Sequence, residues 1–437
     1  MKHLLFLLTT FALLAPSCKK PADSGTVTPP IITTRWVNTD HLLGTLYQPV
    51  KMAATGVEVG TVWIYAEPNA SGSFKLVADS DEGFTCVDDV ARAGLFLLRE
   101  SDLATSPDKV NKLRLMTNFV LQMQSSTGDA GAGYFYNFLW PDKTVNTTFR
   151  TSQNVADWWS WRALWLLSEA GPYFAKTDAA FASQIQTAVG RLVTNMVRDF
   201  GAKPKDANSI QGVAVPKWLP YGSGSDQAAI MLLGLNNVYA QTRTVPVLAL
   251  MEKLADGILL MQKGDAQRFP YGTFLSFENS WHAYGNDQSY ALLTVGKALN
   301  KPDWVAAARR EVENFYPYLM KEGFLESFEI RQSGELFTEV KRSKFSQIAY
   351  GLRPMIWATL ALYEQTKDPK LLEQASQLTR WFLKNNTANA LMYDRATGRG
   401  YDGISSATSV SRNAGAESTI EALLAVQMAE KHGVKLD

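Results

Sequence analysis

Six polar residues recur at nearly equal intervals along the chain, and each opens a run of apolar residues. Successive members lie 68, 69, 61, 60 and 70 residues apart, and they are Asp89, Asp157, Asp226, Asp287, Gln347 and Glu417. Carboxyl groups that crowd around one site push their pKa values apart, so that one is protonated while another is ionised. Cleavage of a glycosidic bond needs that combination, with an acid for the leaving oxygen and a base or nucleophile opposite.

An aspartate at the start of a helix also has a structural explanation, because it caps free backbone N–H groups and interacts well with the helix dipole. That alternative applies to each acid taken singly. Asp88 is the better candidate for a cap, because it points about 100° away from Asp89 around the helix. Side chains on helices packed about 8–10 Å apart can reach the ~5–9.5 Å separation of catalytic carboxyl pairs. We therefore predict Asp89 and Asp157 as the acid/base pair, with Asp287 in reserve.

Each interval between these residues contains the same two elements. An apolar helix such as "RALWLLSEA" comes first, and after a short connection follows an amphipathic helix such as "PDWVAAARREVENFYPYLMK". Two antiparallel helices with a tight turn form a helical hairpin. Six hairpins with the apolar helices inside predict an all-α fold, an (α/α)6 toroid. The chain ends after the sixth apolar helix, so residues 38–54 are expected to supply its outer partner.

The connections between these helices differ in length. Those from an outer helix to the next inner helix run to roughly 20–27 residues, and loops longer than about 12–15 residues are uncommon unless they have a function. Alternating residues in "GYFYNFLWPDK" and "GFLESFEIRQSGELFTEVKRS" predict small β-hairpins there. Because helix direction alternates, all the long loops and the starts of all inner helices should share one face of the ring.

The same segments carry residues suited to binding a sugar, whose C–H face is apolar and whose hydroxyls need polar partners. Arginines there would pair with a uronate or sulfate on the substrate, or would neutralise the acids; Arg342 also falls near this rim. Trp158 also has an alternative role: its helical spacing with Trp161 and Trp165 favours a position in the core. The predicted substrate-binding residues are Asp88, Arg150, Trp158, Trp218, Tyr221, Asp226, Trp281, His282, Tyr284, Arg353 and Glu417.

Several classes of protein find no support in the composition. The net charge is +1 without long charged runs, so no nucleic-acid partner is expected. Four histidines are scattered singly and no Cys-x-x-Cys is present, which argues against a metal site. Phosphate-binding, dinucleotide-binding and Gly-x-Ser-x-Gly motifs do not occur. We expect no cofactor.

The chain begins with "MKHLLFLLTTFALLAPSCKK", a basic residue followed by an apolar run and small residues before Cys18. This resembles a bacterial lipoprotein signal, which predicts a signal peptide over residues 1–17 and lipidation of Cys18. The alternative is plain secretion. Residues 18–35 are polar and proline-rich and predict a flexible tether to a single domain, residues 36–437. We expect a monomer on the outer membrane or cell surface, or in the periplasm, with the lipid anchor as its only membrane contact.

The sixfold repeat, the segment "TCVDDVARA" and the terminal segment "GAESTIEALLA" resemble six-hairpin glycosidase-type proteins of glycan-degrading bacteria. The resemblance covers about residues 36–437 and implies glycoside hydrolases, unsaturated uronyl hydrolases or polysaccharide lyases, among which the fold does not choose. We predict a glycoside hydrolase that acts on an oligo- or polysaccharide. The alternatives are a lyase with His282 and Tyr284 as base and acid, and a glycan-binding protein without catalysis.

Overall fold

A computed structural model describes residues 35–70, 72–126 and 128–436. Residues 36–437 form one compact unit. The predicted signal peptide, Cys18 and the predicted tether before Arg35 lie outside the described residues. Within the described part of the chain, no helix is long and apolar enough to cross a membrane.

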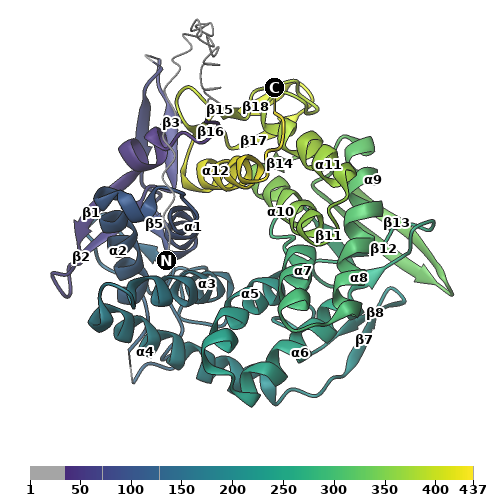
Figure 1. The fold of residues 1–437 in the computed structure, drawn as a ribbon, viewed down its shortest axis with the longest axis horizontal. Coiled ribbons are helices and arrows are strands. Elements are labelled where there is room, and N and C mark those ends of the chain that lie inside the picture. The colour runs from purple at the N-terminus through teal and green to yellow at the C-terminus, as the bar shows by residue number, and fades with distance from the viewer. Residues whose placement is uncertain (1–34, 71, 127, 437) are drawn as a thin grey trace, which may run out of the picture. The chain divides into compact units, whose positions relative to one another are not determined.

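Six inner helices follow one another around a ring, each packed against the next, and the last packs against the first (Figure 1). They are α1 (Val87–Leu98), α3 (Trp158–Phe174), α5 (Ser225–Thr242), α7 (Gln288–Ala298), α10 (Ala349–Thr366) and α12 (Ala416–Lys431). Glycines let neighbouring inner helices approach closely. A Cβ on Gly94 of α1 would lie 2.7 Å from Leu166 of α3, and one on Gly234 of α5 would lie 2.7 Å from Leu164. These helices are buried on nearly all sides, as their apolar composition predicts.

Each outer helix packs against the inner helix that precedes it in the chain. They are α2 (Pro107–Gln122), α4 (Ala179–Met196), α6 (Val245–Leu260), α8 (Pro302–Arg310) and α11 (Pro369–Thr379), and α8 continues through a π-helical turn, Glu311–Phe315, into α9 (Tyr316–Glu322). Side-chain caps start several of them, such as Ser106, which accepts from the Lys109 N–H, and Asp178, which accepts from the Phe181 N–H. The antiparallel hairpins predicted from the repeat are therefore present.

The start of the described chain closes the ring, but with less helix than its partners have. Residues 38–54 supply only a π-helical turn, Leu42–Leu46, which packs against α12, and the chain then continues as a strand. Pro49 has no backbone N–H and does not permit a longer helix. His41 Nε2 contacts the Ala414 carbonyl at 2.7 Å, and the Trp36 N–H donates to Glu430 of α12. The first and last parts of this domain are thus bound together.

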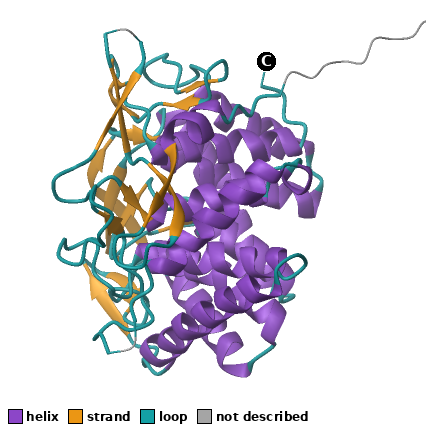
Figure 2. Ribbon diagram, turned by 90° about the vertical axis from the view of Figure 1, so that its left-hand side faces the viewer, coloured by secondary structure: helices purple, strands orange, loops and turns teal. Residues whose placement is uncertain are grey.

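The strands form short antiparallel sheets on one side of the ring, with the helices on the other (Figure 2). The two-stranded sheets are β1 (Tyr47–Lys51) with β2 (Glu58–Val62), β3 (Tyr65–Pro68) with β4 (Phe74–Val77), β5 (Thr85–Cys86) with β6 (Phe138–Leu139), β7 (Ala207–Ile210) with β8 (Val213–Pro216), β9 (Gln262–Lys263) with β10 (Thr273–Phe274), and β15 (Tyr393–Asp394) with β16 (Arg399–Gly400). The three-stranded sheets are β11 (Ser280–His282), β12 (Ser327–Ser333) and β13 (Leu336–Ser343), and β14 (Gln347–Ile348), β17 (Gly403–Ser406) and β18 (Ser409–Ser411). The long loops therefore share one face, and the inner helices begin there, as predicted.

Candidate active site

The six aligned residues lie at or just before the first turns of the inner helices, yet few of them act as caps. Asp157 is the N-cap of α3 and accepts from the Trp158 N–H at 2.7 Å. Asp226 accepts from the Gln227 N–H of its own helix at 2.6 Å. The prediction that Asp88 caps α1 is wrong, because the N-cap is Cys86, whose Sγ accepts from the Asp89 N–H at 3.4 Å. Asp89 and Asp287 bind arginines instead.

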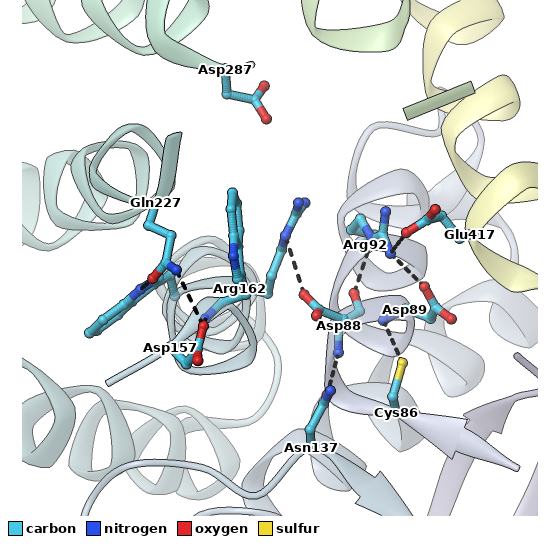
Figure 3. Close-up of polar contacts among 12 residues, drawn as sticks. Cys86, Asp88, Asp89, Arg92, Asn137, Asp157, Arg162, Gln227, Asp287 and Glu417 are labelled. Atoms are coloured by element: carbon cyan, nitrogen blue, oxygen red, sulfur yellow. Dashed lines mark hydrogen bonds and ion pairs between the residues drawn. The ribbon is translucent and has the colours of Figure 1, made fainter. Parts of the chain in front are cut away.

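Two arginines connect the carboxylates at the middle of the ring. Arg92 lies 2.6 Å from Asp89 and 3.0 Å from Glu417 and Glu421 (Figure 3 shows the first two contacts). Arg353 binds the other oxygen of Glu421 at 2.7 Å and both oxygens of Asp287. Burial opposes ionisation of Glu421, but the charges of Arg353 and Arg92 outweigh it and lower its pKa. Glu421 therefore links α1, α10 and α12. Both oxygens of Asp287 are bound to Arg353 in a buried ion pair, so its contacts indicate a structural role.

Asp88 and Asp89 are adjacent but have different surroundings. Asp89 is only 2% exposed, and burial raises its pKa to about 7, although Arg92 acts in the opposite direction. The negative charges of Glu417 and Asp88 raise the pKa of Asp89 further. The side chain of Asp88 is 25% exposed, with an oxygen 3.4 Å from Nε of Arg162 (Figure 3). Asp89 is thus partly protonated at neutral pH, while the side chain of Asp88 is accessible to solvent.

A cavity of about 300 Å³ lies beside this pair, between the start of α1, the start of α12 and the loops around β3 and β16. Asp88, Asp89, Arg92 and Glu417 line it. Polar loop residues complete the lining; they include Tyr65, Asn137, Asp402 and Asn413. These loop residues were not predicted, because the sequence around a single polar residue in a long loop does not show which cavity the residue will line.

Asp157 belongs to a second cluster on the neighbouring helices. The Tyr221 hydroxyl donates to one of its oxygens at 2.5 Å, and Gln227 Nε2 donates to the other at 3.3 Å. Trp161 Nε1 fixes that amide by donating to Gln227 Oε1 at 2.8 Å. Burial raises the pKa of Asp157, the hydrogen bonds from Tyr221 and Trp158 oppose the change, and the charges of Asp88 and Asp226 add to it. Asp88 is therefore an acid of α1 whose charge acts on Asp157.

His282, Asp226 and Tyr284 form a third cluster. His282 Nε2 lies 3.1 Å from Asp226 Oδ2, and the ring of Tyr284 stacks on the imidazole with centroids 3.7 Å apart. Burial, followed by the charge of Asp226, raises the pKa of Tyr284, which is nevertheless an exposed aromatic residue. The sequence predicted all three as site residues, and the structure brings them together.

Two tryptophans predicted to contact a substrate lie in the core instead. Trp218 donates from Nε1 to the Lys253 carbonyl, and Trp281 packs between Phe315 and Phe328. Both are buried, because the apolar surface of a large aromatic ring is most stable inside. Trp158 is partly buried at the start of α3, and Arg150 is exposed in the preceding loop.

The remaining rim residues have structural contacts. The Gln347 amide donates to the Gly323 carbonyl and accepts from Trp381, which ties two loops together. Arg342 pairs with Glu322 and Glu339 on the surface of the hairpin of β12 and β13. Among residues 35–436, apart from residues 71 and 127, no three His, Cys, Asp or Glu side chains are grouped so as to hold a metal ion.

The prediction of site residues from the sequence omitted two arginines and a glutamate inside the inner helices. Arg92, Arg162 and Glu421 stand within apolar helices and are buried. A charged residue in a helix that is apolar all round must find partners inside the protein, so this pattern was the available signal.

No protein-family model matches the chain, and no curated protein matches it. Solved structures do match. A cellobiose 2-epimerase from Spirochaeta thermophila has a TM-score of 0.60 at 14% identity, over 91% of this chain and 95% of that one. A family 76 glycoside hydrolase from a bovine Bacteroides thetaiotaomicron strain has a TM-score of 0.54 at 11% identity, over 92% and 79%. A polysaccharide lyase has a TM-score of 0.51 at 10% identity, over 80% and 92%.

These structures confirm the (α/α)6 toroid. By their titles they are carbohydrate-active enzymes, but they catalyse epimerisation, hydrolysis and elimination. At such low identity the likeness concerns the fold alone, because one fold hosts many different reactions.

Proposed function

We propose that this protein is a glycan-active enzyme that hydrolyses glycosidic bonds in the cavity beside Asp88 and Asp89. The observation that carries the proposal is the pairing of two carboxyls with unlike surroundings at one cavity of about 300 Å³. Pockets for small ligands begin at about this volume. The solved structures with this fold act on saccharides according to their titles, which supports a sugar as the occupant.

In this proposal Asp89 is the general acid and Asp88 the base or nucleophile. With a pKa of about 7, Asp89 retains a proton for the leaving glycosidic oxygen at neutral pH. The Asp88 carboxylate then takes a proton from the attacking water, or attacks the anomeric carbon itself and is released by water in a second step. Arg92 orients Asp89 and Glu417 together. Asp157, which the sequence predicts as the partner of Asp89, is the alternative base.

The test is a screen of the full chain against a panel of polysaccharides and oligosaccharides, followed by kinetics on matched variants. Asp88→Asn and Asp89→Asn should each lower turnover by about 10²–10⁴-fold while the melting temperature changes little. Asp157→Asn compares the two candidate bases directly. Asp303→Asn, at an exposed position in the first turn of the outer helix α8, is the control and should retain full activity. Full activity in both Asp88→Asn and Asp89→Asn would refute this assignment.

The cluster of His282, Asp226 and Tyr284 favours elimination as a second candidate function. A histidine can remove the proton beside a uronate and a nearby tyrosine can supply the acid, once the imidazole releases one of its two contacts, Nε2 with Asp226 or Nδ1 with the Tyr284 carbonyl at 2.9 Å. His282 lies 3.1 Å from Asp226 and stacks on Tyr284. A lyase creates a carbon–carbon double bond, so its product absorbs in the ultraviolet while that of a hydrolase does not. Ultraviolet absorbance during turnover, lost in His282→Gln, would replace the hydrolase assignment by a lyase.

We also propose that Cys18 is lipidated and anchors the domain to a membrane of the bacterial envelope. The sequence around Cys18 supports this proposal. Cys18→Ser should abolish both signal processing and membrane association when cells are fractionated. Unchanged fractionation of the variant would favour plain secretion.

A further inference from the structure

One of the arginines at the middle of the ring lacks the partners that the others have. Arg162 of α3 is 1% exposed, and neither its Nε nor its Nη1 has a hydrogen-bond partner among the described residues. Its nearest acid is Asp88, at 3.4 Å from Nε, whereas Arg92 and Arg353 each bind two or more carboxylates at 3.1 Å or less. Buried donors without acceptors cost free energy, and nearly all buried polar groups are paired.

Two further buried polar groups without a partner among the described residues are the Tyr350 hydroxyl on α10 and Asn286 Oδ1 in the loop before α7. The Arg162 guanidinium carbon lies 5.0 Å from the centre of the Tyr350 ring. A Cβ on Gly285, the neighbour of Asn286, would be 3.2 Å from the Tyr350 hydroxyl and 2.7 Å from Trp158. The unpaired groups of Arg162 on α3 and Tyr350 on α10 therefore belong to one site, which the loop before α7 adjoins at Gly285.

Charges of both signs surround this guanidinium. Burial, followed by the positive charge of Arg92, lowers the pKa of Arg162 to about 10, while the negative charges of Asp88, Glu421 and Asp287 act in the opposite direction. Figure 3 shows the guanidinium reaching past its contact with Asp88, so that its terminal nitrogens extend toward the side of Asp287. Asp287 is already bound to Arg353 on both oxygens. An anion brought to these nitrogens would offset the cost of burying their charge.

We propose that Arg162 and Tyr350 bind the carboxylate of a uronic acid unit in the substrate. A guanidinium presents parallel N–H groups that match the two oxygens of a carboxylate, and the Tyr350 hydroxyl adds a third donor. The Trp158 ring, 5.9 Å from the Arg162 guanidinium carbon, supplies an apolar surface for the C–H face of the same sugar. Asp88 adjoins Arg162, so the bound unit lies next to the proposed hydrolytic pair. The inference rests on the proposed function only in that the ligand is a saccharide.

Binding of small matched sugars tests this assignment on the full chain without requiring turnover. The probes are the methyl glycosides of glucuronate and galacturonate together with the methyl esters of both, which remove the charge and add one methyl group. Calorimetric titration should show at least one acid binding about tenfold or more tightly than its ester, as expected for a charge-assisted bidentate pair. Equal affinity of each acid and its ester for the wild-type protein would overturn the assignment.

Variants locate the preference within the molecule. Arg162→Gln should bind acid and ester equally, whereas Arg243→Gln, which removes an exposed arginine at the far end of α5, should keep the preference. Arg162 is buried, so that variant needs a folding check by circular dichroism. Tyr350→Phe provides the second arm: it deletes a hydroxyl that has no partner, so its melting temperature should stay equal or rise while the affinity for the acid falls. Unchanged preference in Tyr350→Phe and in folded Arg162→Gln would refute the site.

The binding experiments can distinguish failure of the uronate site from failure of the proposed hydrolysis. Tight binding of an acid without cleavage of any glycan would support the uronate site and contradict hydrolysis. Cleavage of neutral glycans with no preference between acid and ester would do the reverse.

Discussion

A single carboxyl, that of Asp89, should set the upper end of the pH range in which the protein is active. A general acid works only while it holds its proton, and burial raises the pKa of Asp89 to about 7. We therefore expect kcat/KM to fall about tenfold per pH unit above pH 7 and to be level just below it. A pH–rate profile of the wild-type protein measures this, and Asp89→Asn should lack the decline. Constant activity up to pH 9 would contradict the role of Asp89.

Glu311, in the π-helical turn after α8, should make stability depend on pH independently of activity. Burial raises its pKa to about 7, against hydrogen bonds from Ser289, the Phe274 N–H and Thr273. The folded state therefore binds the proton more tightly than the unfolded state, so stability falls as pH rises from about 4.5 to 7.

The contribution of Glu311 is on the order of 3 kcal/mol for such a shift. Urea unfolding at pH 5 and pH 8 should show a smaller difference for Glu311→Gln than for the wild type. Glu313→Gln, two residues away, is the matched control and should behave as wild type. Parallel pH dependences for Glu311→Gln and the wild type would show that this carboxyl titrates normally.

At the level of a single helix, Asp157 tests how much the start of α3 depends on its cap. Its carboxylate accepts from the Trp158 N–H and from the Tyr221 hydroxyl. Asp157→Ala should cost about 0.5–2 kcal/mol of unfolding free energy, while Asp157→Asn keeps the cap and should cost much less. Chemical denaturation of the two variants measures the difference. Equal stability of both would mean that α3 is capped by other groups.

The contact between α1 and α3 depends on a missing side chain. A Cβ on Gly94 would lie 2.7 Å from Leu166, so Gly94→Ala should overpack this interface and cost about 1–3 kcal/mol. Gly190 of α4 has nothing within 4 Å of its would-be Cβ, and Gly190→Ala should stabilise the protein by about 0.5–1 kcal/mol. Thermal unfolding of the two variants should thus shift in opposite directions. A Gly94→Ala variant as stable as the wild type would show that α1 and α3 can move apart with little loss of unfolding free energy.

The helices were predictable from sequence because their apolar period is long and repeated, whereas the site was predictable only in part. Asp89, Asp157 and Asp226 were found as helix starts, but the direction in which each carboxyl points depends on the arginine, tyrosine or histidine that contacts it. The strand-like segment that includes Tyr134 and Tyr136 forms only the two-residue strand β6. Such short strands depend on pairing with distant segments, which local alternation does not encode.

For the molecule as a whole, the fold brings the starts of the six inner helices and the long loops to one face of the ring. Carboxylates at the starts of or within α1, α3, α7 and α12 contact arginines or a tyrosine outside their own helix. A site assembled in this way forms only when the ring is complete. We therefore expect binding and global unfolding to be lost at the same denaturant concentration, and a fluorescence and activity titration on one sample to coincide.

The contacts that join the beginning of the domain to its last helix also imply that the ring can form whichever hairpin comes first in the chain. Trp36 and His41 are bound to Glu430 and Ala414, so the domain's ends are neighbours. A circular permutant that joins these ends by a short linker and opens the chain between Asn300 and Lys301, in the short connection before α8, retains every closing contact. We expect this permutant to fold with native helix content by circular dichroism and to unfold in one transition. A molten or aggregated permutant would show that one hairpin must be made first.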